Sequence, residues 1–193
     1  MEDKYINFAA LADAEPGGAF SITALDRGSD VCIIGPHGGK IESGTSELAR
    51  AVASDTWSLY LFEGRKNSGN RDLHITSTNF DEPRGDALVR KSEVAIAFHG
   101  CSGEGEAIFL GGRHMQLIER MGKNLLDAGF AVARHNDPDL QGISVANICN
   151  RGQSGMGVQF EMTIALRDRL KNSERNSERP NLSDFVDAIR RAI

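Results

Sequence analysis

The chain has 193 residues, 40% of them hydrophobic and 25% charged, with a formal net charge of −5 at pH 7. This composition is ordinary for a soluble globular protein, and the length suits a single domain over residues 1–193. The acidic balance argues against a nucleic-acid partner, and three scattered cysteines exclude a disulfide framework.

Short apolar runs bounded by turn residues predict strands, and helical patterns lie between several of them. In chain order, the predicted strands cover 31–35, 57–64, 73–78, 93–100, 107–112 and 157–163. The predicted helices cover 46–54, 115–129, 164–170 and 183–193.

Local signals refine these elements. Thr45 is the expected N-cap of the first helix, and Gly129 is expected to close the second. The polar segment 171–182 is predicted to be a solvated loop. Near-continuous apolar strands separated by helices predict an α/β sheet that helices cover on both faces.

The segment GPHGGKIESGTSE, residues 35–47, follows the first predicted strand. His37 lies just beyond the C-terminal end of that strand, where open α/β sheets place their ligands. Glu42 follows five positions later across two glycines, whose flexible backbone lets both side chains converge. An imidazole nitrogen and a carboxylate oxygen, each within about 2.0–2.2 Å of an ion, suit zinc. A surface loop with a solvated His and Glu is the alternative for this segment alone.

A phosphate-binding loop is the competing interpretation of a Gly-rich turn between strand and helix. That motif needs Gly, four residues and then Gly-Lys-Ser/Thr. Here Lys40 is followed by Ile41, and the spacing back to Gly35 is too short. Glu42 would also repel a phosphate, so the segment is a poor phosphate cradle.

The segment EVAIAFHGCSGEG, residues 93–105, repeats the pattern of a histidine after an apolar strand. A lone histidine at a strand end is more often a core or edge residue than a ligand. If the two strands are parallel neighbours, however, His37, Glu42 and His99 meet at one edge of the sheet. Two histidines and one glutamate, with an open position, are typical of catalytic zinc.

The segment GMGVQFEMTIALRD, residues 155–168, carries a carboxylate within an apolar strand. Glu161 shares one face of this strand with Gln159. A buried carboxylate is costly unless it is paired or lies near a metal or cleft. We predict that Glu161 is the general base that takes a proton from water and delivers it to the leaving amine. A buried ion pair with an arginine is the alternative.

Other histidine patterns carry less weight. His74 could orient substrate or support a metal ligand from outside its coordination shell. His114 and His135 are expected to be solvated. The motif HExxH does not occur, which excludes a thermolysin-like zinc site as a simple interpretation.

Seven motifs in one order resemble the poly-γ-glutamate hydrolase family of bacteriophages and bacterial chromosomes. The motifs, which span about residues 31–170, are PHGGKIESGTSELARA, LFEGRK, LHITSTNFDEP, AFHGC, FLGG, NICNRG and GVQFEMT. The resemblance implies a zinc carboxypeptidase-like fold, an open mixed sheet with helices on both faces in three layers. It also implies one Zn²⁺ held by His37, Glu42 and His99, with Glu161 as the catalytic glutamate.

The family's substrate is a polymer of glutamates joined through their side-chain carboxyls, which leaves a free α-carboxylate on each unit. Arginine matches such carboxylates through a bidentate hydrogen-bonded fork. Asn150-Arg151 resembles the Asn-Arg pair with which carboxypeptidases bind a substrate carboxylate, although its place in the chain order differs. We therefore expect Asn150, Arg151, Arg84 and His74 to bind substrate.

The expected function is hydrolysis of the γ-linked amide bonds of polyglutamate by a zinc enzyme. A zinc-dependent deacylase of small N-acyl amino acids is the alternative within the enzyme class. A non-catalytic module that binds phosphate or nucleic acid is the alternative from another class.

The location in the cell follows from segments that the sequence lacks. No apolar run approaches the roughly 20 residues that cross a bilayer, and the first residues lack a basic segment followed by an apolar one. We expect a cytoplasmic protein without a membrane partner, which cell lysis would release to an extracellular polymer. The sequence does not determine the oligomeric state, and a monomer is compatible with it.

Overall fold

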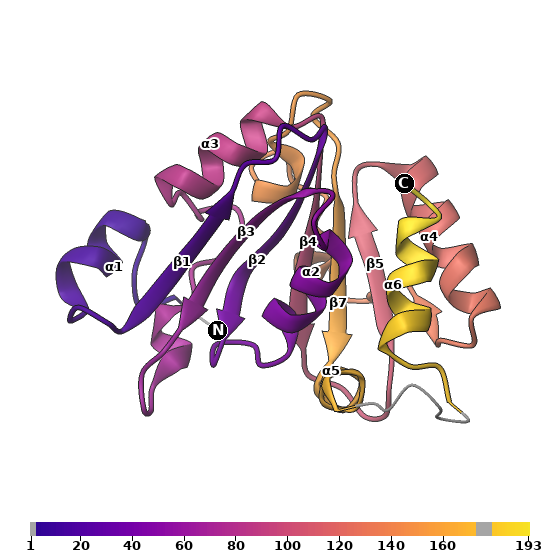
Figure 1. The fold of residues 1–193 in the computed structure, drawn as a ribbon. Helices are drawn as coiled ribbons and strands as arrows, with labels where there is room; N and C mark the ends of the chain where they lie inside the picture. Colours follow the sequence, from indigo (N-terminus) through magenta and orange to yellow (C-terminus); the bar gives the residue numbers. More distant parts are fainter. Residues whose placement is uncertain (1–2, 173–178) are drawn as a thin grey trace.

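The computed structural model describes residues 3–172 and 179–193 and has a seven-stranded sheet in the order β1-β3-β2-β4-β7-β5-β6 (Figure 1). The strands are β1 (Phe20–Leu25), β2 (Val31–Gly39), β3 (Ser58–Gly64), β4 (Val94–Cys101), β5 (Ile108–Gly112), β6 (Val132–Ala133) and β7 (Val158–Thr163). The helices are α1 (Phe8–Ala14), α2 (Thr45–Ala53), α3 (Pro83–Lys91), α4 (Met115–Asp127), α5 (Ile164–Lys171) and α6 (Leu182–Arg190). The shorter 3₁₀ turns are η1 (Asn70–Leu73), η2 (Pro138–Leu140) and η3 (Ile148–Asn150).

The middle of the sheet is parallel and its edges are mixed. Strands β3, β2, β4 and β7 run parallel to one another, so their carboxyl ends meet at one edge. Strand β1 pairs antiparallel with β3, and β5 pairs antiparallel with β7 and parallel with β6. The prediction of an open mixed sheet is confirmed.

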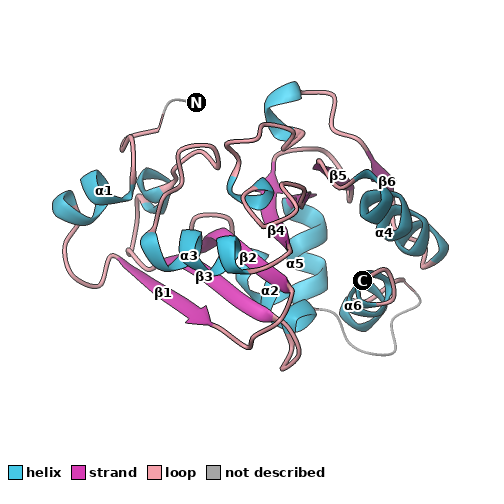
Figure 2. Cartoon of the chain, turned by 90° about the horizontal axis from the view of Figure 1, so that it is seen from above, coloured by secondary structure: helices cyan, strands magenta, loops and turns pink. Residues whose placement is uncertain are grey.

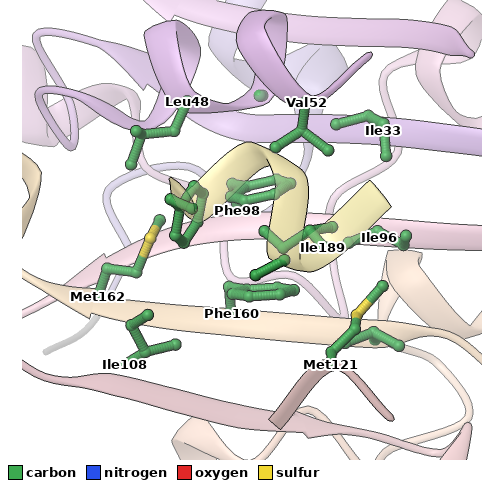
Figure 3. Close-up of a cluster of buried hydrophobic side chains, with 14 of the residues drawn as sticks. Ile33, Leu48, Val52, Ile96, Phe98, Ile108, Met121, Phe160, Met162 and Ile189 are labelled. Carbon is green, nitrogen blue, oxygen red and sulfur yellow. The ribbon is translucent and has the colours of Figure 1, made fainter. Parts of the chain in front are cut away.

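Helices cover both faces of the sheet. Ile96 and Phe98 of β4 contact the larger apolar cluster, to which α2, α4, α5 and α6 contribute. The alternate residues Ala95 and Ala97 belong to a second cluster, to which α1 and α3 contribute. Figure 3 shows the larger cluster, in which Phe98 and Phe160 lie among side chains of α2 and α6. Seen from above, α4 and α6 lie next to each other, far from α1 (Figure 2).

The last turn of α4 explains why this helix stops where the sequence predicted. Gly129 adopts a φ of 89°, which residues other than glycine rarely adopt. Its N–H donates to the Leu126 carbonyl, and the N–H of Phe130 donates to the Leu125 carbonyl. This pair of bonds is a Schellman motif, so the predicted closure by Gly129 is confirmed.

Two local predictions are wrong. Thr45 is the first residue of α2 rather than its N-cap, which is Gly44 with a φ of 96°. The Thr45 hydroxyl instead donates to the Glu42 carbonyl at 2.8 Å. Segment 73–78 forms the end of η1 and a loop rather than a strand, because the Ile75 and Ser77 carbonyls bind other segments.

The predicted loop and the expected absence of a membrane span can be compared with the described residues only. The predicted loop over 171–182 lies largely at residues 173–178, outside the described ranges. Within 3–172 and 179–193, none of the helices has the length and apolar character that a bilayer crossing requires.

Candidate functional site

Three potential metal ligands converge at the carboxyl ends of β2 and β4. The Nδ1 atoms of His37 and His99 lie 3.1 Å apart. A Glu42 carboxylate oxygen lies 3.3 Å from His37 Nδ1, and the other lies 3.8 Å from His99 Nδ1. The two histidines are buried and Glu42 is partly buried, so the structure brings together the three residues that the sequence singled out.

The end of β2 is irregular, and this irregularity positions His37 and Glu42. The register between β2 and β3 shifts between Gly35 and Gly38, on either side of Pro36 and His37. Beyond it, the chain turns back, and the Glu42 N–H donates to the His37 carbonyl at 2.9 Å. At Gly39 φ is 62°, and a Cβ would lie 2.6 Å from the Gly64 carbonyl oxygen, so only glycine fits there.

Backbone groups orient these ligands. His37 Nε2 donates to the Ile75 carbonyl at 2.8 Å, which leaves Nδ1 facing the other ligands. The Gly100 N–H donates to Glu42 Oε2 at 2.8 Å. The Ser77 hydroxyl lies 3.5 Å from His99 Nε2. Such outer contacts set the orientation and tautomer of metal-binding side chains.

Close packing of the ligands shifts their pKa values in different directions. Burial lowers the pKa of His99, and the charge on His37 lowers it further, to about 3. Burial alone would raise the pKa of Glu42, but the neighbouring His37 brings it to about 2. Burial opposes the charge on His37, yet Glu42 raises the pKa of this histidine. Without a metal, these shifts favour a proton on His37 over one on His99 or Glu42.

The donor set fits a tetrahedral divalent cation. Ligand atoms about 2.0–2.2 Å from such an ion lie about 3.3–3.6 Å from one another. The two Nδ1 atoms lie 3.1 Å apart, Glu42 Oε1 lies 3.3 Å from His37 Nδ1, and Glu42 Oε2 lies 3.8 Å from His99 Nδ1, all close to that range. Two imidazole nitrogens facing each other at 3.1 Å would also repel without a proton or a cation between them. Among the described residues, these three form a candidate metal site, and three protein ligands leave the fourth position of a tetrahedral ion to a non-protein ligand.

Glu161 lies beside this site on the neighbouring strand β7. It pairs in register with His99, and both side chains lie on the face opposite Phe98 and Phe160. Gln159 Nε2 donates to Glu161 Oε1 at 3.0 Å, so the predicted shared face is observed. Burial raises the pKa of Glu161 well above its usual value, and the charge on Glu42 adds to this effect. This environment favours the protonated form of the carboxyl more than water does.

His74 also lies at the site, held by a residue that sequence reasoning missed. Its ring lies against that of His37, with centroids 4.0 Å apart, and its Nε2 is 3.9 Å from Glu42 Oε1. Its Nδ1 donates to Asp3 at 2.8 Å, and the Thr76 N–H donates to the same carboxylate at 2.6 Å. Burial and the charge on His37 lower the pKa of His74 to about 4. No sequence signal linked Asp3 to a segment 71 residues away.

Two of the predicted substrate-binding residues are occupied within the fold. Arg151 donates five hydrogen bonds to the Thr78, Phe80 and Ala146 carbonyls and the Asp86 carboxylate. The buried Asn150 amide bonds backbone groups of residues 142, 144 and 157.

The expectation that Asn150 and Arg151 bind substrate stays a prediction. In the fold, their polar atoms join the loops around the site. Arg84, at the start of α3, keeps an exposed side chain with one bond to Glu82, and the structure leaves its predicted role open.

Comparison with known proteins shows which family this chain resembles. The family model described as poly-gamma-glutamate hydrolase matches residues 5–188. Two proteins of Bacillus subtilis (strain 168) are similar in sequence. The UPF0714 protein YndL is 39% identical over 170 residues, which are 88% of this chain and 67% of YndL. The SPbeta prophage-derived UPF0714 protein YoqZ is 40% identical over 172 residues, which are 89% of this chain and 62% of YoqZ.

Solved structures are similar along nearly the whole chain. A bacteriophage poly-gamma-glutamate hydrolase superposes with a TM-score of 0.90 at 35% identity, over 99% of this chain and 96% of that one. YndL in a zinc-free apo form superposes with a TM-score of 0.89 at 35% identity, over 99% of this chain and 97% of that one. This chain spans about two thirds of the length of its curated relatives in Bacillus subtilis.

Proposed function

We propose that this chain, which belongs to the poly-γ-glutamate hydrolase family, cleaves the γ-glutamyl amide bonds of poly-γ-glutamate with the help of one zinc ion. The observation that carries the proposal is the convergence of His37, Glu42 and His99, with Glu161 in register with His99. The phage hydrolase and zinc-free YndL, which share the fold at 35% identity, support both the substrate and the metal. Residues 1–193 would act as a single catalytic domain.

His37, Glu42 and His99 would hold the zinc ion. His37 would bind through Nδ1, because its Nε2 already donates to the Ile75 carbonyl. Glu42 would keep its hydrogen bond from the Gly100 N–H, which fixes the carboxylate against β4. When bound, zinc would polarise the amide carbonyl and activate water for attack.

Glu161 would move the proton. Its carboxylate takes a proton from the attacking water, whose oxygen joins the carbonyl carbon of the amide. It then delivers that proton to the nitrogen as the C–N bond breaks, which leaves one amine and one carboxylic acid, and the acid loses its remaining proton to solvent. Its raised pKa suits the second part of this role, because a carboxyl that binds its proton more strongly than usual can act as the general acid toward the leaving nitrogen. Gln159 keeps the carboxyl in place through the bond at 3.0 Å.

His74, whose ring lies against that of His37, would contact the substrate. Because its Nδ1 donates to Asp3, the neutral ring presents Nε2 as a hydrogen-bond acceptor near Glu42. An acceptor there suits the N–H of the scissile amide. Arg84 has an exposed guanidinium that suits an α-carboxylate of the polymer.

The test is a size assay on high-molecular-weight poly-γ-glutamate with the zinc-loaded protein. We expect the polymer to shorten, with new amino groups appearing in proportion. Protein treated with a chelator should leave the polymer intact until zinc is restored. An intact polymer together with hydrolysis of small N-acyl amino acids would contradict the proposal and favour a deacylase.

A further inference from the structure

Arg167 is a buried cation that none of the steps above uses. It lies on α5, just after β7, and only 5% of its surface is exposed. Burying a guanidinium is costly unless its charge and its donors are satisfied. Its partners therefore indicate what this residue does in the molecule.

The guanidinium of Arg167 joins three segments of the fold. Its Nε donates to the Met162 carbonyl at 3.0 Å, and its Nη1 donates to the Ser43 carbonyl. Its plane also lies against Gly100, where an added Cβ would be 2.5 Å from the Arg167 Cζ. On the other side of the same arginine, a Cβ at Gly44 would be 3.0 Å from the Arg167 Cβ.

The three contacted residues share a place in the sequence. Ser43 follows Glu42, Gly100 follows His99, and Met162 follows Glu161. Successive residues of a strand point to opposite faces, so at Gly100 of β4 the guanidinium lies behind the sheet, on the face opposite His99. A single side chain thus contacts the next residue after three of the four proposed site residues.

We propose that Arg167 is a positioning residue that sets the relative placement of Glu42, His99 and Glu161 from behind the sheet. This inference rests on the proposed function. A planar guanidinium can donate to two carbonyls in different directions at once, which fixes the turn after Glu42 relative to the end of β7. The charge of Arg167 also opposes the effect of burial on the pKa of Glu161.

Substitutions at position 167 can separate the charge, the hydrogen bonds and the volume of the arginine side chain. Lysine keeps the charge but has a compact ammonium without the flat fork, so it can reproduce only part of the bridge. Methionine fills the space but donates no hydrogen bond. Arg169 offers a matched control on the same helix, because it binds Glu106 and the Pro180 carbonyl and none of the residues next to the site.

The test measures the zinc affinity of metal-free protein by competition with a chromophoric chelator, at a temperature where each variant is folded. We expect Arg167→Met to weaken zinc binding about 10- to 100-fold, as loss of outer-shell support usually does. Arg167→Lys should recover part of this loss. Arg169→Met should bind zinc within about twofold of the unmodified chain, even if its Tm falls.

A second measurement keeps the test decisive if Arg167→Met does not fold. Gly100→Ala would place a methyl group against the guanidinium, and we expect it to weaken zinc binding about tenfold. Combined with Arg167→Lys, whose slimmer ammonium leaves more room, its effect should be smaller than in the unmodified chain.

Unchanged zinc affinity in both Arg167→Met and Gly100→Ala would overturn the inference, as would unchanged affinity in Gly100→Ala if Arg167→Met fails to fold. These measurements use no polymer. If poly-γ-glutamate stays intact but zinc affinity falls as described, the positioning role stands and the proposed substrate fails.

Discussion

The two faces of β4 and β7 differ sharply in chemistry although they belong to the same strands. On one face, Phe98 and Phe160 stack with centroids 4.9 Å apart and an interplanar angle of 13°. On the other, His99 and Glu161 lie side by side in register, both buried. Burial of the aromatic pair stabilises the fold, whereas burial of the polar pair costs free energy that hydrogen bonds only partly offset. The burial of His99 and Glu161 therefore indicates a functional role rather than a contribution to stability.

Substitutions on the two faces should therefore separate stability from metal binding. The largest effect is expected from Phe160→Ala on the aromatic face. The change removes the ring stacked on Phe98 and leaves a cavity, so the free energy of unfolding should fall by about 3–5 kcal/mol. Chemical denaturation measures this loss. Zinc bound per folded chain should stay the same, and loss of zinc from the folded variant would show that the faces are not independent.

On the polar face, Glu161→Gln should lower kcat at least about a hundredfold, because the amide cannot carry the proton. Zinc content should not change, since the ligands are His37, Glu42 and His99. The Tm should stay the same or rise, because a buried ionisable group is replaced by a neutral one of similar shape. A fully active variant would remove Glu161 from the mechanism.

Acidity should affect zinc binding through one ligand rather than three. The raised pKa of His37 means that this histidine keeps its proton to a higher pH than a free imidazole, and zinc must displace it. With pKa values of about 3 for His99 and about 2 for Glu42, the other ligands are already deprotonated. Below the pKa of His37, zinc affinity should fall about tenfold for each unit of pH.

The zinc dissociation constant measured from about pH 8 to about pH 5 checks this slope. If zinc affinity instead falls a hundredfold or more for each unit of pH, several ligands bind protons together. The raised pKa of His37 also sets how the stability of the metal-free protein depends on pH. The stabilisation that His37 contributes is fully present below its unfolded pKa and is lost as the pH rises through its raised folded pKa.

A smaller effect should come from the N-terminal segment. Asp3→Asn removes the charged acceptor of the His74 Nδ1–H, which should lower kcat/KM about tenfold while zinc content stays constant. Lys4→Ala is the matched control, because Lys4 binds Asp72 and Glu15 but none of the site residues. Equal rates for Asp3→Asn and the unmodified chain would mean that His74 needs no support from Asp3.

Sequence reasoning located the strands and ligands whose signals are local. The apolar runs of β2, β4 and β7 are continuous, and His37 and His99 stand at strand ends, so a parallel pairing of β2 and β4 sufficed to bring them together. Glu161 was detectable because a carboxylate within an apolar strand is unusual. Helix α3 was missed because Leu88 and Val89 are its only buried large apolar residues, too few for a helical pattern.

Contacts between residues far apart in the sequence could not be predicted. The sequence shows the charge of Arg151 but not the carbonyls at 78, 80 and 146 to which its guanidinium donates in the fold. Asp3 and Arg167 likewise gave no local signal in the sequence. Their roles depend on residues more than 60 positions away, which only the folded chain brings near.

The most direct test of the metal site is elemental analysis of protein equilibrated with zinc and freed of excess metal. The proposed ligand set predicts close to one zinc per chain in the unmodified protein and in Glu161→Gln, and none in folded His99→Ala. A folded His99→Ala variant that retains its zinc, or an unmodified chain that binds none, would contradict it.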